Sequence, residues 1–135
     1  MAPEEQNPKL LSPLTLAFVG DGVYELLVRK RIVEAGSMPP KKLNAHKVEM
    51  VRASAQAAVY DGLEPLLTED ERDMLKRGRN AHTGSVPKNA QMADYRKATG
   101  VEALFGFLYL KGDRERLYFL FDEAMRIFTE RVEKK

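Results

Sequence analysis

The spacing of apolar residues is the feature that most constrains this chain, because it follows the period of a helix and nowhere alternates as in a strand. A first helix is expected to start at Ser12-Pro13, a hydroxyl N-cap followed by proline, and to stop at Gly36. A second helix is expected from Pro39-Pro40 toward Asp61-Gly62, with a break and a new start near Ser54. A third should begin at the capping box Thr68–Glu71 and end near Gly78. The last two are expected from about Ala93 to Lys111 and from Asp113 onward. The polar stretch 80–91 is expected to be a loop. These signals predict an all-α fold, built as a bundle of helices.

One domain is expected over residues 1–135, because this length is close to the usual size of a single domain. Residues 1–11 are expected to form a flexible N-terminal segment. The chain has no cysteine, which excludes disulfides, thiolate metal sites and cysteine nucleophiles, and its two histidines, His46 and His82, are expected at the surface. The longest apolar runs, such as 103–110, are far shorter than the roughly 18 residues that a membrane span requires. Since the N-terminus does not resemble a signal peptide, we expect a cytoplasmic protein with no membrane partner.

Positive charge is concentrated in two segments, although the net charge of the chain is only +2. Residues 28–52 and residues 72–97 each contain seven basic and two acidic side chains. Residues 53–71, between them, contain five acids and no base. Two such basic segments can form a face for the phosphates of a nucleic acid, and an ordinary mixed surface explains them equally well.

Two glycines, Gly20 and Gly22, interrupt the first expected helix on either side of Asp21. A glycine in a helix interior costs about 1 kcal/mol relative to alanine, so the pair indicates a close backbone approach or a functional exception. The third glycine of a dinucleotide-binding motif is missing. The same helix is apolar on several sides, which fits either a central core helix or a helix that also faces a second subunit.

Two acids lie in mostly apolar helices: Asp21 in LAFVGDGVYELL and Glu102 in GVEALFGFLYL. Buried carboxylates are usually paired or metal-bound, and Mg²⁺ often takes only one or two protein carboxylates together with water. Each acid taken alone also has an ordinary interpretation, in which Asp21 pairs with a basic side chain of another helix and Glu102 is solvated. Glu25 is expected to form a helix-surface pair with Arg29.

Three motifs resemble the ribonuclease III family. Residues 16–25 (LAFVGDGVYE) look like the signature helix of the ribonuclease III catalytic domain, and residues 101–110 (VEALFGFLYL) look like its second acidic helix. Between them, residues 76–81 (KRGRNA) and 87–89 (PKN) resemble the short bacterial branch called Mini-ribonuclease III. The resemblance covers about residues 12–130. It implies a ribonuclease III endonuclease-domain-like helical bundle that acts as a homodimer on double-stranded RNA.

The resemblance assigns Asp21 as the central catalytic and metal-binding carboxylate and Glu102 as the second, with Mg²⁺ as the cofactor and Mn²⁺ as a substitute. Two positions that are acidic in the larger family are Ala17 and Thr99 here. A site in which Asp21, Glu102, water and an RNA phosphate share the ion therefore suits this chain better than a full cage of protein ligands. The expected reaction is hydrolysis of a phosphodiester by water, which leaves 5′-phosphate ends.

The resemblance also implies that the catalytic domain itself binds RNA, since the chain ends at Lys135 without a double-stranded RNA-binding domain. The candidate RNA-binding residues are Lys76, Arg77, Arg79, Asn80, Lys88 and Asn89. Alternatively, Arg77 and Arg79 only stabilise the C-terminal end of their helix, where positive charge interacts favourably with the helix dipole. The implied role is maturation of the large-subunit (23S) ribosomal RNA precursor, with or without the help of a ribosomal protein. The competing interpretations are a non-catalytic helical double-stranded RNA-binding module and a helical protein-interaction adaptor.

Overall fold

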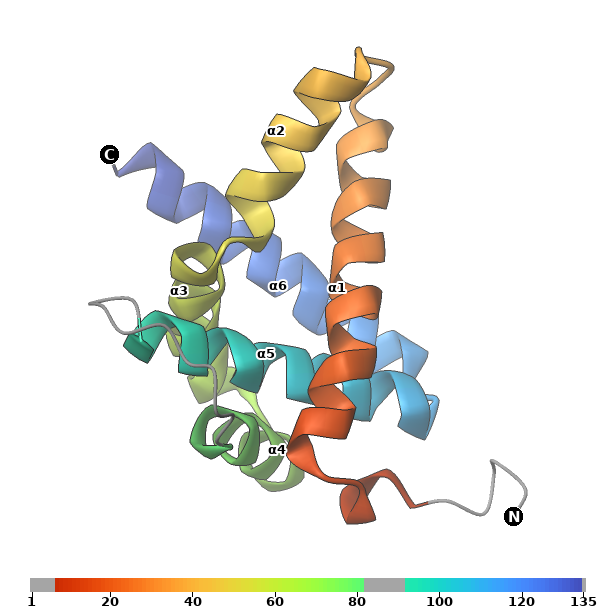
Figure 1. The fold of residues 1–135 in the computed structure, drawn as a ribbon, viewed down its shortest axis with the longest axis vertical. Helices are drawn as coiled ribbons and strands as arrows, with labels where there is room; N and C mark the ends of the chain where they lie inside the picture. Colours follow the sequence, from red (N-terminus) through yellow and green to blue (C-terminus); the bar gives the residue numbers. More distant parts are fainter. Residues whose placement is uncertain (1–6, 82–91, 135) are drawn as a thin grey trace.

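The computed structural model describes residues 7–81 and 92–134 (Figure 1). This part of the chain forms α1 (Pro13–Glu34), α2 (Pro40–Val51), α3 (Ala53–Leu63), α4 (Glu69–Asn80), α5 (Met92–Lys111) and α6 (Arg114–Glu133). Two short 3-10 turns, η2 (Pro8–Leu10) and η3 (Glu64–Leu66), precede α1 and follow α3. The described residues contain no strand, which confirms the predicted all-α class. None of their helices is long and apolar enough to cross a membrane.

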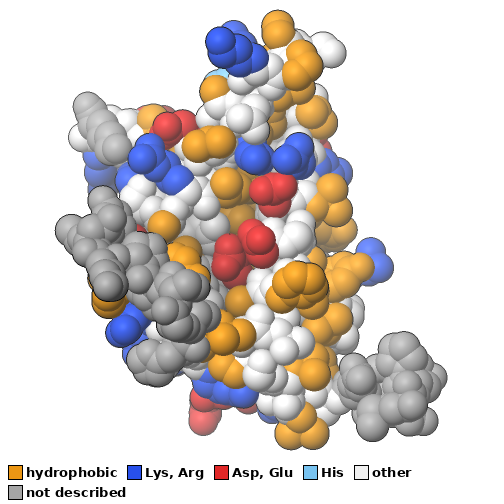
Figure 2. Space-filling view, in the orientation of Figure 1, with side chains coloured by type: hydrophobic (Ala, Val, Ile, Leu, Met, Phe, Trp, Pro, Cys, Tyr) orange, Lys and Arg blue, Asp and Glu red, His pale blue; other side chains and the backbone are white. Residues whose placement is uncertain are grey.

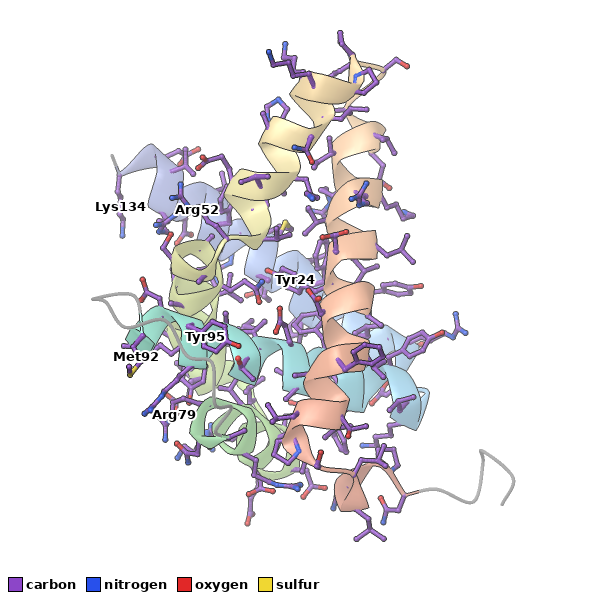
Figure 3. All side chains as sticks on the ribbon, viewed as in Figure 1. Tyr24, Arg52, Arg79, Met92, Tyr95 and Lys134 are labelled. Atoms are coloured by element: carbon purple, nitrogen blue, oxygen red, sulfur yellow. The ribbon has the colours of Figure 1, made fainter. Side chains whose placement is uncertain are left out.

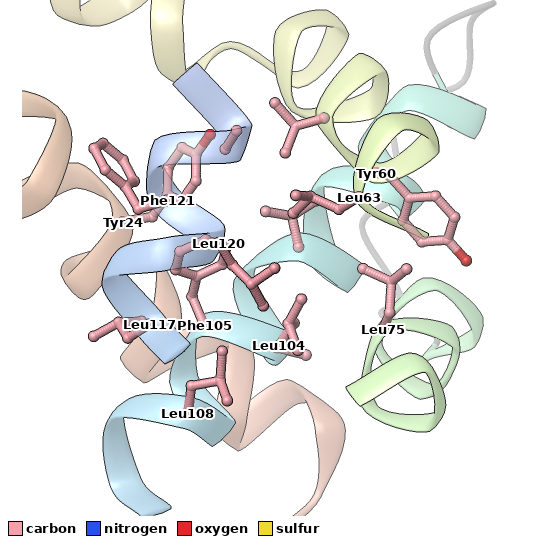
Figure 4. Close-up of a cluster of buried hydrophobic side chains, with 14 of the residues drawn as sticks. Tyr24, Tyr60, Leu63, Leu75, Leu104, Phe105, Leu108, Leu117, Leu120 and Phe121 are labelled. Carbon is pink, nitrogen blue, oxygen red and sulfur yellow. The ribbon is translucent and has the colours of Figure 1, made fainter. Parts of the chain in front are cut away.

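Helix α5 forms the centre of the fold, and α1, α3, α4 and α6 pack against it (Figures 1 and 4). Its residues 103–108 are all buried, as expected of its apolar sequence. Phe105 packs edge-on against Tyr24 of α1 with 5.0 Å between ring centroids, and Tyr24 packs in the same way against Phe121 of α6 at 5.7 Å. These three rings join α1, α5 and α6 in one core.

Local signals place most helix ends where the sequence predicts them. The Ser12 hydroxyl accepts a hydrogen bond from a backbone N–H in the first turn of α1, and Thr68 and Glu71 form the capping box of α4. Asp113 caps α6. Gly36 follows α1 with a φ of 122°, a conformation that favours glycine. The short-range hydrogen bonds of these caps explain why the sequence alone was sufficient to find them.

Two helix ends lie within two residues of the predicted positions. The long second helix is broken at Arg52, whose extended backbone separates α2 from α3, two residues before Ser54. Helix α4 continues past Gly78 to Asn80. Gly78 is buried against α5, where an added Cβ would lie 2.7 Å from the Cβ of Ala103. This glycine therefore serves close helix packing and is not a helix stop.

Residues 7–11, the described part of the segment expected to be flexible, lie against α4. The Arg77 guanidinium donates hydrogen bonds to the backbone carbonyls of Lys9 (3.1 Å) and Leu11 (3.3 Å). Lys9 also forms an ion pair with Asp70 at 2.7 Å. These contacts join the chain just before α1 to the surface of α4.

Candidate active site

Two glycines allow α1 and α5 to cross in backbone contact. A Cβ added at Gly20 would overlap the backbone carbonyl of Glu102, and one added at Gly106 would overlap the carbonyl of Leu16. Gly22 has no neighbour within 4 Å of such an atom among the described residues. The close approach suggested by the sequence therefore concerns Gly20, whose contact with the Glu102 backbone places the two acids of the motifs beside each other.

The carboxylates of Asp21 and Glu102 meet at this crossing. Burial and the negative charge of Asp21 raise the pKa of Glu102 to about 8, and a protonated Glu102 is placed to donate a hydrogen bond to Asp21. Asp21 itself is exposed, and neither acid forms a salt bridge among residues 7–81 and 92–134. Figure 2 shows acidic side chains at the centre of the face on which α1 crosses α5. Neither ordinary interpretation, a basic partner for Asp21 or a solvated Glu102, describes this pair.

The set of oxygen ligands at this crossing is small. Ala17 is buried, and the Thr99 hydroxyl donates to the backbone carbonyl of Tyr95 at 3.1 Å, one turn back on its own helix. The described part of the chain contains no group of three or more acidic or histidine side chains that could hold a metal ion. Two adjacent carboxylates without a cationic partner fit Mg²⁺, which completes its shell with water and substrate oxygens.

Glu25 does not belong to the pair, although it follows Asp21 by one helical turn. Its carboxylate lies between Arg29 of α1, at 3.1 Å, and Lys47 of α2, at 3.8 Å. The pair with Arg29 is the one that the sequence predicts, and the contact with Lys47 joins α2 to α1 beside the site.

Two buried polar side chains near the acids were not expected from the sequence. Tyr24 is almost fully buried, and burial together with the charge of Glu102 raises the pKa of its hydroxyl (Figure 3). Gln56 of α3 is 3% exposed and lies beside Glu102. An amide in an alanine-rich helix carries no local signal of a site, so only the packing of α3 against α5 identifies it.

The basic residues proposed to bind RNA have different surroundings. Lys76 is exposed, whereas Arg77 is occupied by the carbonyls of Lys9 and Leu11. Arg79 donates to the Asn80 side chain at 3.1 Å and lies over the ring of Tyr60, near the start of α5 (Figure 3). Lys88, Asn89 and His82 lie outside the described residues, and His46 is exposed on α2. The structure therefore brings together Asp21 and Glu102. It places the predicted RNA-binding residues Lys76, Arg77 and Arg79 away from this pair, on α4.

The stability of the metal-free protein is expected to fall as the pH rises from 5 to 8. Over this interval the folded chain retains a proton on Glu102 that the unfolded chain has lost, because the folded pKa is about 8 and the ordinary value is 4.5. The free energy of unfolding should fall by up to roughly 1.4 kcal/mol per pH unit and level off above the folded pKa. Urea unfolding in EDTA at several pH values measures this slope.

In the Glu102→Gln variant, most of this pH dependence should disappear. Glu25→Gln is the matched control and should retain it, since Glu102 is untouched. Parallel pH profiles for the wild type and Glu102→Gln would contradict the prediction.

Comparison with known protein families identifies the family of this chain. The model described as "Ribonuclease III domain" matches residues 14–113, which include both acids and the α1–α5 crossing. The chain belongs to the ribonuclease III family. The predicted endonuclease-domain fold is confirmed, and the match supports the expected class of ribonucleases.

Similar proteins point to the short branch of the ribonuclease III family. Mini-ribonuclease 3 of Symbiobacterium thermophilum is 50% identical over 111 residues, which cover 82% of this chain and 85% of the relative. Mini-ribonuclease 3 of Staphylococcus aureus is 40% identical over 130 residues, covering 95% and 97%. A crystal structure of a Fusobacterium nucleatum protein superposes with a TM-score of 0.79 at 28% identity, covering 90% of this chain and 98% of that one. The resemblance to Mini-ribonuclease III is thereby confirmed.

Proposed function

We propose that this chain is an Mg²⁺-dependent endoribonuclease that cleaves double-stranded RNA, with Mn²⁺ as a substitute ion. The observation that carries the proposal is the meeting of Asp21 and Glu102 at the α1–α5 crossing, where no described basic side chain neutralises them. Two carboxylates held together by the fold are costly to ionise together, and a bound cation would remove that cost.

Asp21 and Glu102 are the residues that would hold the ion. When bound, Mg²⁺ supplies Lewis-acid chemistry: it lowers the pKa of water and offsets negative charge on the phosphate. The chain itself holds the two carboxylates in place through the glycine crossing and exposes Asp21 to the substrate. Water is the attacking group in this proposal, because the chain has no cysteine and the described histidine, His46, is exposed on α2. The expected products carry 5′-phosphate and 3′-hydroxyl ends.

Basic side chains near the acids would attract the RNA. Figure 2 shows lysine and arginine side chains above the acidic centre and others toward the lower left of the same face. The first basic segment, 28–52, comprises the end of α1 and the whole of α2, and the described part of the second segment includes most of α4 and the start of α5. Contacts of this kind with phosphates and 2′-hydroxyls recognise the shape of an RNA duplex rather than its sequence.

Lys76 and Arg77 are neighbours that should respond differently to alanine substitution. Lys76→Ala should weaken duplex RNA binding a few-fold and reduce the slope of log affinity against log salt concentration by about one. The free energy of unfolding should stay within about 0.5 kcal/mol of the wild type. Arg77→Ala should lower the free energy of unfolding by about 1–3 kcal/mol, because the carbonyls of Lys9 and Leu11 lose their hydrogen bonds. Thermal unfolding and RNA binding at several KCl concentrations separate the two. A stability loss in Lys76→Ala alone would reverse these assignments.

An apolar surface on α1 supports a homodimer. Hydrophobic side chains follow the side of α1 that faces away from α2 (Figure 2). Phe18 of α1 is 82% exposed. A hollow of about 440 Å³ lies beside it; its lining includes Val19, Leu26, Tyr109 and Tyr118. Contiguous exposed apolar surface of this kind usually marks a protein interface. Two copies of the site would allow both strands of a duplex to be cut.

Phe18→Glu is expected to convert the dimer into a monomer, because a charge replaces an aromatic ring in the proposed interface. Sedimentation should show a mass near 15.3 kDa for the variant and twice that for the wild type. Val48→Glu, at a half-exposed position of α2, is the matched control and should stay dimeric. A wild type that is monomeric at micromolar concentration would contradict the dimer.

The biological substrate belongs to the same proposal. We place the enzyme in the cytoplasm, in maturation of the 23S ribosomal RNA precursor, with or without a ribosomal protein. The support is the similarity to Mini-ribonuclease 3 proteins over most of the chain.

Cleavage of a long RNA duplex tests the proposal directly. The purified protein should cut the duplex in Mg²⁺ or Mn²⁺, should not cut it in EDTA, and should leave the separated strands largely intact. Salt-sensitive duplex binding without cleavage in either ion would favour the non-catalytic module, which Ala17 and Thr99 make a real alternative. Absence of any binding would favour a protein-interaction adaptor.

A further inference from the structure

A buried glutamine of α3 reaches the candidate active site. Gln56 is 3% exposed, and apart from tyrosines the only other buried residue with a polar or charged side chain in the described part of the chain is Glu71, at 5%. Glu71 is explained by the α4 capping box and by its ion pair with Arg116. Gln56 has no such local role, and burying an amide is unfavourable unless its hydrogen-bonding groups are used.

The Gln56 side chain lies between a helix end and the site. Its Nε2 atom donates to the backbone carbonyl of Val51, the last residue of α2, at 2.8 Å. Carbonyls in the last turn of a helix lack partners within the helix, so this bond has a structural role. The same side chain lies close enough to the Glu102 carboxylate to oppose the rise in its pKa. The Oε1 atom has no partner among the described residues, so the side chain retains one free acceptor.

We infer that Gln56 is a positioning residue that fixes the Glu102 carboxylate for a divalent cation. The inference rests on the proposed function. A site with only two protein carboxylates depends strongly on the orientation of each, because Ala17 and Thr99 supply no further oxygen ligand to it. Partners behind metal ligands commonly change metal affinity or activity by about 10- to 100-fold when they are removed. Anchored to Val51, the amide would hold Glu102 from α3, whereas Asp21 reaches Glu102 from α1.

Binding of Mn²⁺ to the free protein tests this inference without any RNA. In Gln56→Met, which retains the side-chain length but makes no hydrogen bond, the dissociation constant for Mn²⁺ measured by electron paramagnetic resonance should rise about 10-fold. The Mg²⁺ concentration that gives half-maximal cleavage should rise by a similar factor, while KM for duplex RNA at saturating Mg²⁺ stays constant. Gln56→Asn, whose amide is one methylene shorter, should change Mn²⁺ affinity in the same direction.

Tyr60→Phe is the matched control. Its hydroxyl is also buried on α3 without a hydrogen-bond partner among the described residues, but it lies one turn beyond Gln56, and the charged groups that act on it are Arg79, Glu64 and Lys97 rather than Glu102. This variant should bind Mn²⁺ like the wild type. Unchanged Mn²⁺ affinity in both folded Gln56 variants, or equal weakening in Tyr60→Phe, would overturn the positioning role.

The same measurement distinguishes failure of the inference from failure of the proposed function. If the wild type does not bind Mn²⁺, or if Asp21→Asn binds it equally well, both are overturned. If the wild type binds Mn²⁺ through Asp21 and the Gln56 variants match it, only the role of Gln56 is overturned. Unfolding in EDTA verifies that each variant is folded before its affinity is compared.

Discussion

The Asp21→Asn variant is expected to lose RNA cleavage almost completely while it retains its fold and its affinity for duplex RNA. Metal-assisted polarisation of water and phosphate is worth several kcal/mol of barrier, so the rate should fall by roughly three orders of magnitude or more. Asparagine has nearly the same shape, and Asp21 is exposed and makes no salt bridge among the described residues, so little packing is lost. The cleavage rate in excess Mg²⁺ and RNA binding in EDTA measure the two effects.

Glu25→Gln is the control for charge on the same face of α1. Its carboxylate pairs with Arg29 and Lys47 and does not join the Asp21–Glu102 pair, so cleavage should stay within a few-fold of the wild type. A nearly normal rate in Asp21→Asn would show that Asp21 is not the metal-binding carboxylate.

The Gly20→Ala variant is expected to unfold or to be destabilised by at least about 3 kcal/mol. The added methyl group would overlap the backbone carbonyl of Glu102, and a backbone atom in the middle of a helix cannot rotate away as a flexible side chain can. That loss is a large fraction of the roughly 5–15 kcal/mol that stabilises a typical domain. Urea unfolding followed by circular dichroism measures the change.

Gly22→Ala is the matched control, two residues away in the same helix. No atom of the described residues lies within 4 Å of its added Cβ, and alanine favours a helix over glycine by about 1 kcal/mol. The variant should be as stable as the wild type or more stable. Wild-type stability in Gly20→Ala would mean that α1 and α5 do not touch at this glycine.

Helix ends and caps could be predicted from the sequence because their hydrogen bonds join residues only a few positions apart. Ser12, Thr68 and Asp113 all cap the helices expected of them. The packing role of Gly78 could not be predicted, because a glycine near a helix end and a glycine under a crossing helix look the same locally. Arg77 is a similar case, since basic residues of the same type serve a surface or a structural contact according to their neighbours.

The sequence by itself determined the all-α class, most helix boundaries, the two acids and the family to which they belong, because these depend on short-range periodicity and on motifs of contiguous residues. Only the tertiary structure decided which glycine is the contact, that Arg77 binds the segment before α1, and that Gln56 lies behind Glu102. Asp21 and Glu102 are far apart along the chain, and Gln56 lies on a third helix. Their meeting depends on how α1, α3 and α5 pack, and side-chain contacts between distant helices leave no periodic pattern in any one of them.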